Sequence, residues 1–207
     1  MNNADWLTAF LAAAPAARAL SVESDAYTTV LGAHGGEPRV IVALGTGSIA
    51  AALDEHGVCR ISGGYGFPSG DEASGAWLDL RAVVHLQRVL DGRAPEDGWS
   101  RELLARTGAT DCDSLVVWLC NANQTAYATL APTVFEFRDH PEAARLLNQA
   151  GLEIVRLVAA LDPPGALPVA LCGGLALRAV RARRAARAPA GPARGFRRGC
   201  ARTGAAR

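Results

Sequence analysis

The chain has 207 residues, half of them apolar, which is enough to bury the core of one domain or slightly more. Its formal net charge is only +1, and no apolar run is long enough to span a bilayer. The cysteines include no C-x-x-C pair, which argues against a disulfide framework and against a zinc site built on cysteine. The apolar stretch 7–17 follows Asp5 rather than a basic leader, so we expect a cytoplasmic protein.

The first segments are predicted to form two short helices. Asn3 or Asp5 could cap a helix that stops at Pro15. Ser24 then stands where a second N-cap would, directly before Asp25. The Asp25 carboxylate could cap this helix, or it could act as a general base toward a hydroxyl that attacks a phosphoryl group.

A meander of three strands with glycine-bearing turns is the clearest pattern in the chain. The runs 40–44 and 48–53 are short and apolar, as expected of buried strands, and 58–61 follows them. Between the first two runs, Gly45-Thr46-Gly47-Ser48 could form a nest of backbone N–H groups and hydroxyls that binds phosphate oxygens. An ordinary hairpin turn explains the same residues equally well.

The next glycine-rich segment, 63–72, carries one aromatic ring, Tyr65, and two carboxylates, Asp71 and Glu72. Carboxylates and backbone amides bind sugar hydroxyls, and a ring can stack on an apolar sugar face. Alternatively, Asp71 and Glu72 are first-turn residues of the helix that follows. That helix is expected to carry the apolar residues Trp77, Leu80, Val84 and Leu86.

The second half of the chain predicts one long helix and one further strand. Apolar residues keep a helical period from Ala143 to Leu161. The run 167–172 is a buried-strand candidate that ends in Gly173-Gly174-Leu175, which could accept an adenine or form a plain turn. Strands that alternate with helices after the meander indicate an α/β or α+β core.

The end of the chain has a different composition. Residues 178–207 hold ten of the 21 basic residues and no acidic one. The segment could be an arm that binds nucleic acid. Its richness in Arg, Ala, Pro and Gly favours instead a translational frame change near Ala176 in GC-rich coding sequence. We therefore do not expect nucleic acid as a partner, and we expect 178–207 to be disordered.

The order and spacing of these segments resemble the N-acetylglucosamine kinase family, the BadF/BadG-type branch of the actin, Hsp70 and sugar-kinase superfamily. The resemblance covers about residues 1–177 and implies an α/β fold. That fold is a ribonuclease H-like, actin-type ATPase lobe with a mixed sheet and flanking helices, mainly the C-terminal lobe of a two-lobe sugar kinase. The segments that carry the resemblance are 22–26, 41–50, 63–66, 70–75 and, similar to the superfamily's adenosine motif, 171–175.

The resemblance also implies a role for each matched residue, with ATP and Mg²⁺ as cofactors and an amino sugar as substrate. Asp25 would deprotonate the sugar 6-hydroxyl, so that the γ-phosphoryl group of ATP is transferred to N-acetylglucosamine. Homodimers are usual in the family. The binding roles fall on the phosphate residues Gly45, Thr46, Gly47 and Ser48, on the adenosine residues Gly173, Gly174 and Leu175, and on the sugar residues Gly64, Tyr65, Gly66, Asp71 and Gly75.

One family feature has no counterpart in this sequence. Family members begin with an Asp-x-Gly-x-Thr strand turn whose aspartate helps to place the magnesium ion, so we expect residues 1–177 to lack most of the N-terminal lobe. Three alternatives to the first assignment stay open. They are a glucosamine kinase, an ATPase of the activator type, whose cluster-binding cysteines this chain does not match, and a truncated lobe without catalysis.

Overall fold

The computed structural model describes residues 3–13, 20–35, 37 and 39–178, so the expected stop at Pro15 and the expectation for 179–207 lie outside the described residues. In the part that is described, no helix is both long and apolar enough to cross a membrane. The elements are α1 (Asn3–Ala13), α2 (Asp25–His34), β1 (Arg39–Leu44), β2 (Ser48–Leu53), β3 (Cys59–Gly63), α3 (Gly75–Leu90), α4 (Gly98–Thr107), α5 (Cys112–Asn121), α6 (Gln124–Ala128), α7 (Ala131–Glu136), α8 (Pro141–Leu161) and β4 (Val169–Cys172).

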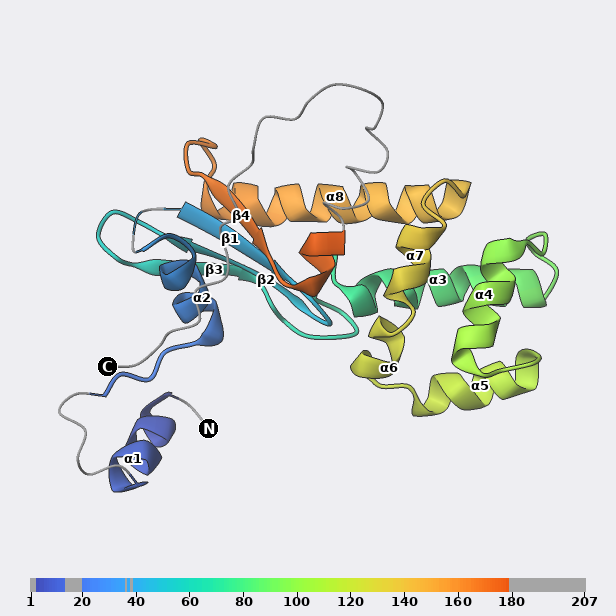
Figure 1. The fold of residues 1–207 in the computed structure, drawn as a ribbon, viewed down its shortest axis with the longest axis horizontal. Helices are drawn as coiled ribbons and strands as arrows, with labels where there is room; N and C mark the ends of the chain where they lie inside the picture. The colour runs from blue at the N-terminus through green and yellow to red at the C-terminus, as the bar shows by residue number, and fades with distance from the viewer. Residues whose placement is uncertain (1–2, 14–19, 36, 38, 179–207) are drawn as a thin grey trace, which may run out of the picture.

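A four-stranded mixed sheet in the order β3-β2-β1-β4 occupies one half of the molecule (Figure 1). β1 runs antiparallel to β2, with Arg39 opposite Leu53 and Leu44 opposite Ser48. β3 continues the antiparallel meander, whereas β4 pairs with β1 in parallel. The predicted meander and the predicted α/β fold with a mixed sheet are thereby confirmed.

Both faces of β1 are covered, because alternate residues of a strand point to opposite faces of the sheet. Ile41 packs with Leu53 of β2 and Val30 of α2 in a small cluster on one face. Val40 and Val42 point to the other face and join the larger core that α3, α7 and α8 help to form. Burial on two sides explains why the strand is apolar without a break.

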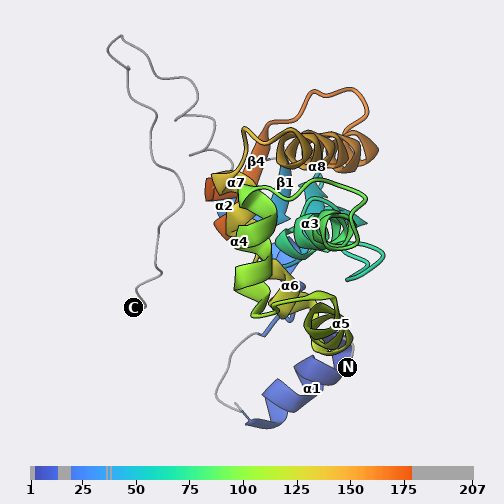
Figure 2. The same cartoon turned by 90° about the vertical axis from the view of Figure 1, so that its right-hand side faces the viewer.

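Helices α3 and α8 lie side by side in both ribbon views and connect the helical half to the sheet (Figures 1 and 2). Trp77 and Leu86 of α3 are buried in the same core as Leu146 and Leu157 of α8. A Cβ atom on Gly63, the last residue of β3, would lie 2.8 Å from Cδ2 of Leu157, so the sheet and α8 are in close contact. The single long helix predicted from Ala143 onward therefore serves both halves of the molecule.

The start of α3 differs from one of the two sequence interpretations. The helix begins at Gly75, and Ser74 is its N-cap, with Oγ accepting a hydrogen bond from the backbone N–H of Trp77 at 3.1 Å. Asp71 and Glu72 thus precede the helix and are not first-turn residues. Their carboxylates are not explained by the helix dipole.

Two expected core positions are more exposed than their apolar character suggests. Val84 is 39% exposed, because the buried stripe of α3 passes through its neighbour Val83 instead. β4 was expected to be fully buried, yet Val169 is 47% and Leu171 43% exposed. β4 is the edge strand of the sheet, and only alternate residues reach the core.

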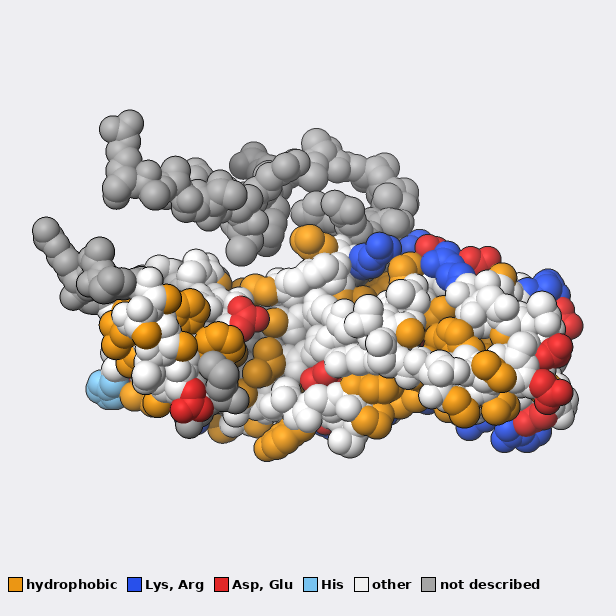
Figure 3. Space-filling model, turned by 90° about the horizontal axis from the view of Figure 1, so that it is seen from below, with side chains coloured by type: hydrophobic (Ala, Val, Ile, Leu, Met, Phe, Trp, Pro, Cys, Tyr) orange, Lys and Arg blue, Asp and Glu red, His pale blue; other side chains and the backbone are white. Residues whose placement is uncertain are grey.

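Exposed apolar side chains are found on several helices, including Val117 of α5 and Val155 of α8. α1 lies outside the layered body in Figure 1, and its Trp6 and Phe10 rings, each about half exposed, stack at 5.9 Å. Charged side chains of both signs gather at the helical end of the molecule (Figure 3). There, Arg106 pairs with Glu102 and Glu136.

The junction between β4 and the helical turn that starts at Gly174 yields a stability prediction. Gly173 has a φ of +92°, and a Cβ atom there would overlap the carbonyl oxygen of Leu44 at the end of β1. We expect Gly173→Ala to lower the free energy of unfolding by at least about 1–3 kcal/mol, the cost of the backbone conformation alone. Urea denaturation measures this. Gly174→Ala is the matched control, since an added Cβ there meets no described atom within 4 Å; equal losses in the two variants would contradict the prediction.

Candidate functional site

The turn between β1 and β2 is fixed to the start of α3 by backbone hydrogen bonds. The N–H of Gly75 donates to the carbonyl oxygen of Gly45 at 2.8 Å, and the N–H of Ala76 donates to that of Thr46 at 3.3 Å. These bonds, with the Ser74 cap, satisfy three of the N–H groups that a helix start leaves free. Position 75 needs a small residue, because a Cβ atom there would lie 3.2 Å from the Gly45 oxygen.

A pocket of about 290 Å³ opens beside this turn. Five of the residues predicted from sequence meet there, although they come from three segments far apart in the chain. Glycines contribute much of the wall, so a ligand could approach the backbone closely. The lining residues are Gly45, Thr46, Gly75, Ala128, Ala131, Pro132, Gly174, Leu175 and Arg178.

Asp71 lies behind the turn and is almost fully buried, with 6% of its surface exposed. Its Oδ2 accepts a hydrogen bond from Nε2 of Gln124 at 2.6 Å. A Cβ atom on Gly47 would lie 2.7 Å from that same oxygen and 3.2 Å from the Gln124 nitrogen. The second glycine of the turn therefore leaves the space in which this polar pair forms.

The loop that holds Asp71 has an unusual backbone. Asp71 and Ala73 have φ values of 57° and 67°, in the left-handed region that costs a non-glycine residue of order 1–3 kcal/mol. The loop is held in place by Ser48, whose Oγ donates to the carbonyl oxygen of Glu72 at 2.6 Å. That hydroxyl is engaged inside the protein, so Ser48 supports the loop that presents Asp71. Backbone strain of this kind concentrates at functional sites.

The remaining predicted residues lie outside the pocket lining. Asp25 is the first residue of α2 and is exposed, while Ser24 is the N-cap and accepts the N–H of Tyr27 at 3.2 Å. The capping interpretation of Asp25 is therefore wrong, and within the described chain its carboxylate has no hydrogen bond. Tyr65 is 88% exposed between Gly64 and Gly66, which both have positive φ.

Of the three residues predicted to bind adenosine, Gly174 and Leu175 line the pocket. Gly173 is not among the lining residues, but it packs against the backbone of Leu44 at the end of β1. Leu175 is buried, whereas Gly174 is open to solvent. The predicted phosphate and adenosine segments are thus brought together at the carboxyl ends of the paired parallel strands β1 and β4.

Five residues at or near the pocket were not predicted from the sequence. Four of them line it, Ala128, Ala131, Pro132 and Arg178, and the fifth is Gln124, which bonds to Asp71. Arg178 follows the adenosine motif by three positions and was assigned to the tail, but it closes the helical turn that starts at Gly174. The residue before Gln124, Asn123, is the N-cap of α6, and its Oδ1 accepts the N–H of Ala126 at 2.9 Å. A cap of this kind marks the start of a helix and does not indicate a ligand site. Pro132 has no local signal for a ligand site.

Asp79 of α3 supports the wall of the pocket from inside the core. Its side chain is fully buried, and in the described structure neither carboxylate oxygen has a partner in good hydrogen-bond geometry. Burial raises the pKa of the Asp79 carboxyl well above its usual value, and the backbone N–H groups of Ala131 and Leu130 offset this only in part. The neutral, protonated form of the Asp79 carboxyl is therefore favoured in the folded protein.

The chain is similar to one family of ATPases and to proteins named as sugar kinases. The model of the BadF/BadG/BcrA/BcrD ATPase family matches residues 6–185. The glucosamine kinase GspK of Vibrio cholerae is 32% identical over 172 residues, which are 82% of this chain and 58% of that protein. A Dictyostelium discoideum protein named N-acetyl-D-glucosamine kinase is 28% identical over 120 residues, 56% of this chain and 38% of its own length.

Two solved structures share the fold. The crystal structure named "Putative N-acetylglucosamine Kinase from Chromobacterium violaceum" superposes with a TM-score of 0.80 at 46% identity, over 88% of this chain and 64% of that one. A Porphyromonas gingivalis structure gives a TM-score of 0.69 at 24% identity over the same shares, which supports the fold alone. The chain thus spans less than two thirds of the length of each of these four proteins.

The raised pKa of Asp79 predicts how stability depends on pH. The folded state holds this proton to higher pH than the unfolded chain does, so the free energy of unfolding falls as pH rises from about 4 through the raised pKa. Asp79→Asn removes the titration while keeping the shape of the neutral acid. We expect the stability of the variant relative to the wild type to grow as pH rises from about 4 through the raised pKa, by up to about 1.4 kcal/mol for each unit of pH.

Urea denaturation at several pH values checks this expectation. Asp113→Asn, an exposed position on α5, should leave the pH dependence of the wild type unchanged. If the free energy of unfolding of Asp79→Asn has the same pH dependence as that of the wild type, the folded protein does not hold the Asp79 proton to higher pH, and the prediction is wrong.

Proposed function

The chain belongs to the BadF/BadG/BcrA/BcrD ATPase family, and from that premise we propose that it is the ATP- and sugar-binding lobe of an amino-sugar kinase. The reaction would transfer the γ-phosphoryl group of ATP to the 6-hydroxyl of N-acetylglucosamine. We assign residues 1–177 to this lobe, and we expect a cytoplasmic protein that forms homodimers. The observation that carries the proposal is the pocket in which the β1–β2 turn meets the helical turn at Gly174.

The pocket suits a nucleotide for three reasons. Thr46 offers a hydroxyl, and Arg178 a guanidinium that can form charge-assisted hydrogen bonds with phosphate oxygens. Gly174 leaves space for a flat adenine ring above the helical turn, with the apolar Leu175 beneath it. Among the described residues that line the pocket there is no carboxylate, so we propose no side-chain ligand there for the Mg²⁺ that accompanies ATP.

The sugar would be held by the loop between β3 and α3. Asp71 would accept hydrogen bonds from sugar hydroxyls, and Gln124 fixes its carboxylate for that task. Tyr65 is exposed enough to stack on the apolar face of a sugar ring. Asp25 would accept the proton of the sugar 6-hydroxyl while the oxygen of that hydroxyl attacks the γ-phosphorus of ATP. ADP would be the leaving group.

The choice between two amino sugars depends on the 2-amino group, which is acetylated in one and cationic in the other. The Vibrio cholerae relative, 32% identical over 172 residues, is named a glucosamine kinase, and this favours glucosamine as the second candidate substrate. An activator-type ATPase and a lobe without catalysis are the remaining alternatives. Two measurements, one of binding and one of turnover, separate all four.

ATP binding can be tested on the chain as it stands. A leucine at position 174 would extend into the space of the pocket, because its Cβ meets no described atom within 4 Å and the residue lines the pocket. We expect Gly174→Leu to weaken ATP binding at least about tenfold, equivalent to about 1.4 kcal/mol, with an unchanged unfolding midpoint. Isothermal calorimetry measures the affinity. Gly151→Leu, at an exposed position of α8 that does not line the pocket, controls for general effects of a new leucine. Equal ATP affinity in wild type and Gly174→Leu would contradict the assignment of the pocket.

Turnover tests the reaction and the role of Asp25. ATP-dependent phosphorylation should be followed with N-acetylglucosamine, glucosamine and glucose, on this chain and on a longer version preceded by the N-terminal lobe of a relative. We expect Asp25→Asn to lower kcat at least about 10²-fold, a typical contribution of a general base. Glu23→Gln, exposed in the same segment, should have little effect. If the longer version phosphorylates no amino sugar, the proposed reaction is wrong; a near-normal Asp25→Asn rate would remove only Asp25 from its role.

A further inference from the structure

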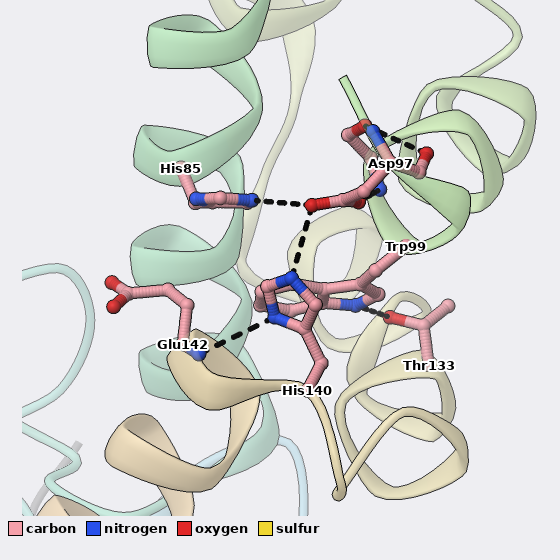
Figure 4. A network of polar contacts seen from close by, with 7 residues as sticks. His85, Asp97, Trp99, Thr133, His140 and Glu142 are labelled. Atoms are coloured by element: carbon pink, nitrogen blue, oxygen red, sulfur yellow. Dashed lines mark hydrogen bonds and ion pairs between the residues drawn. The ribbon is translucent and has the colours of Figure 1, made fainter. Parts of the chain in front are cut away.

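Three helices bring two imidazoles and one carboxylate together on the far part of α3 (Figure 4). His85 lies ten residues along α3 from Gly75, which corresponds to about 15 Å. Asp97 is the N-cap of α4, and His140 is the N-cap of α8. The sequence analysis gave none of these residues a role, and the proposed kinase reaction uses none of them.

The three side chains point their ligand atoms at one another. Nε2 of His140 lies 3.0 Å from Oδ2 of Asp97, and Nε2 of His85 lies 3.8 Å from the same oxygen. All three atoms lie within 4.8 Å of one another. The tighter contact is a hydrogen bond, whereas 3.8 Å is too long for one.

The His85 nitrogen is the feature that the protein alone does not explain. The side chain is only 10% exposed, and Nε2 has no hydrogen-bond partner among the described groups. A buried polar atom left unpaired costs free energy, so it indicates an interaction that the polypeptide does not supply. We propose that His85, Asp97 and His140 bind a Zn²⁺ ion through His85 Nε2, Asp97 Oδ2 and His140 Nε2.

The geometry and the donor set fit zinc. Metal–ligand bonds of about 2.0–2.2 Å in a tetrahedron place neighbouring ligand atoms roughly 3.3 Å apart. The observed 3.0 and 3.8 Å lie on either side of that value, and the two imidazole nitrogens lie within 4.8 Å of each other. Side-chain shifts of about an ångström would therefore form the site. Imidazole nitrogen suits zinc far better than magnesium. Asp97 and His140 keep 27% and 23% of their side-chain surface exposed, which gives access for the ion and for a water molecule as fourth ligand.

The surrounding groups hold the ligands in place. The rings of His85 and His140 lie 5.0 and 5.1 Å from the ring of Trp99, which is fully buried. Nε1 of Trp99 donates to Oγ1 of Thr133 at 3.4 Å. The other carboxylate oxygen of Asp97 accepts the N–H of Ser100 at 2.8 Å, which leaves Oδ2 directed at the imidazoles. Fixed supporting groups of this kind are what a metal site requires.

Zinc binding would change one bond at the start of α8. Nδ1 of His140 accepts the backbone N–H of Glu142 at 3.3 Å, so the ring proton resides on Nε2 and is donated to Asp97. Coordination through Nε2 moves that proton to Nδ1 and breaks the long bond to Glu142. The protein would lose the hydrogen bonds of His140 with Glu142 and with Asp97, and would gain three bonds to the metal. Because the three ligands come from α3 and from the N-caps of α4 and α8, these bonds would link the three helices.

The test uses the full chain, stripped of metal with a chelator and titrated with Zn²⁺ in a calorimeter. We expect one equivalent to bind and the thermal unfolding midpoint to rise with Zn²⁺ concentration. Mg²⁺ at the same concentrations should produce neither effect. Co²⁺ should give the visible absorption of a site with nitrogen and oxygen ligands. These readouts do not require kinase activity, so they stand whether or not the proposed function is right.

Two variants remove a ligand and keep the cap. Asp97→Asn retains an acceptor for the N–H of Ser100, and His140→Asn retains one for the N–H of Glu142. Each should weaken Zn²⁺ binding at least about tenfold, the lower bound for losing even a supporting partner of a metal ligand. His56→Asn, at an exposed turn, should leave the affinity unchanged. Circular dichroism and the metal-free unfolding midpoint check that the variants fold.

The outcomes that overturn the proposal are distinct from those that support it. Equal Zn²⁺ affinity in wild type, Asp97→Asn and His140→Asn means that the ion binds elsewhere, with the free cysteines the first candidates. A Co²⁺ complex with thiolate charge-transfer bands has the same meaning, and no binding at all refutes the site. If both variants fail to fold, the Co²⁺ spectrum of the wild type decides alone: histidine and carboxylate ligation supports the site, and any other spectrum rejects it.

Discussion

The close approach of three backbones at the carboxyl end of β1 is the constraint on which the site depends. Gly173 packs on the carbonyl of Leu44 where β4 ends, and Gly75 donates its N–H to Gly45 where α3 begins. Side chains at these two positions would separate the segments. Because β1 and β4 are parallel, both strands end at the same edge of the sheet, and the pocket lies in the crevice that follows them. The topology, together with the missing Cβ atoms, therefore makes the pocket.

A second layer of contacts allows the loop beside the pocket to keep an unfavourable backbone. Asp71 is in the left-handed region, and the surroundings must compensate for that conformation. Ser48 of β2 holds the loop through the carbonyl of Glu72, and Gln124 of α6 holds the Asp71 carboxylate itself. The carboxylate is thus oriented before any ligand arrives, which lowers the ordering cost of binding.

The parts of the structure that follow from local patterns could be read from the sequence, and the parts that follow from long-range contacts could not. Ser24 was recognisable as a cap because a cap depends on the next three residues, and β1 because it is buried on both faces. Gln124 bonds to a residue 53 positions away, and His140 to one 43 positions away. No periodicity marks such pairs. The run that forms β4 was predicted to be a buried strand, because an apolar run does not show which face of the strand stays uncovered.

Helix α3 connects the pocket to the cluster of His85, Asp97 and His140. Gly75 at its first residue contacts the β1–β2 turn, Asp79 lies in the core, and His85 reaches the cluster. Apolar packing alone tolerates small rotations and shifts of a helix, whereas polar contacts have narrow ranges of distance and angle. Contacts of this kind near both ends of α3 fix its rotation about its own axis. An ion bound at the His85 end would therefore also restrain the start of the helix, which holds the β1–β2 turn beside the pocket.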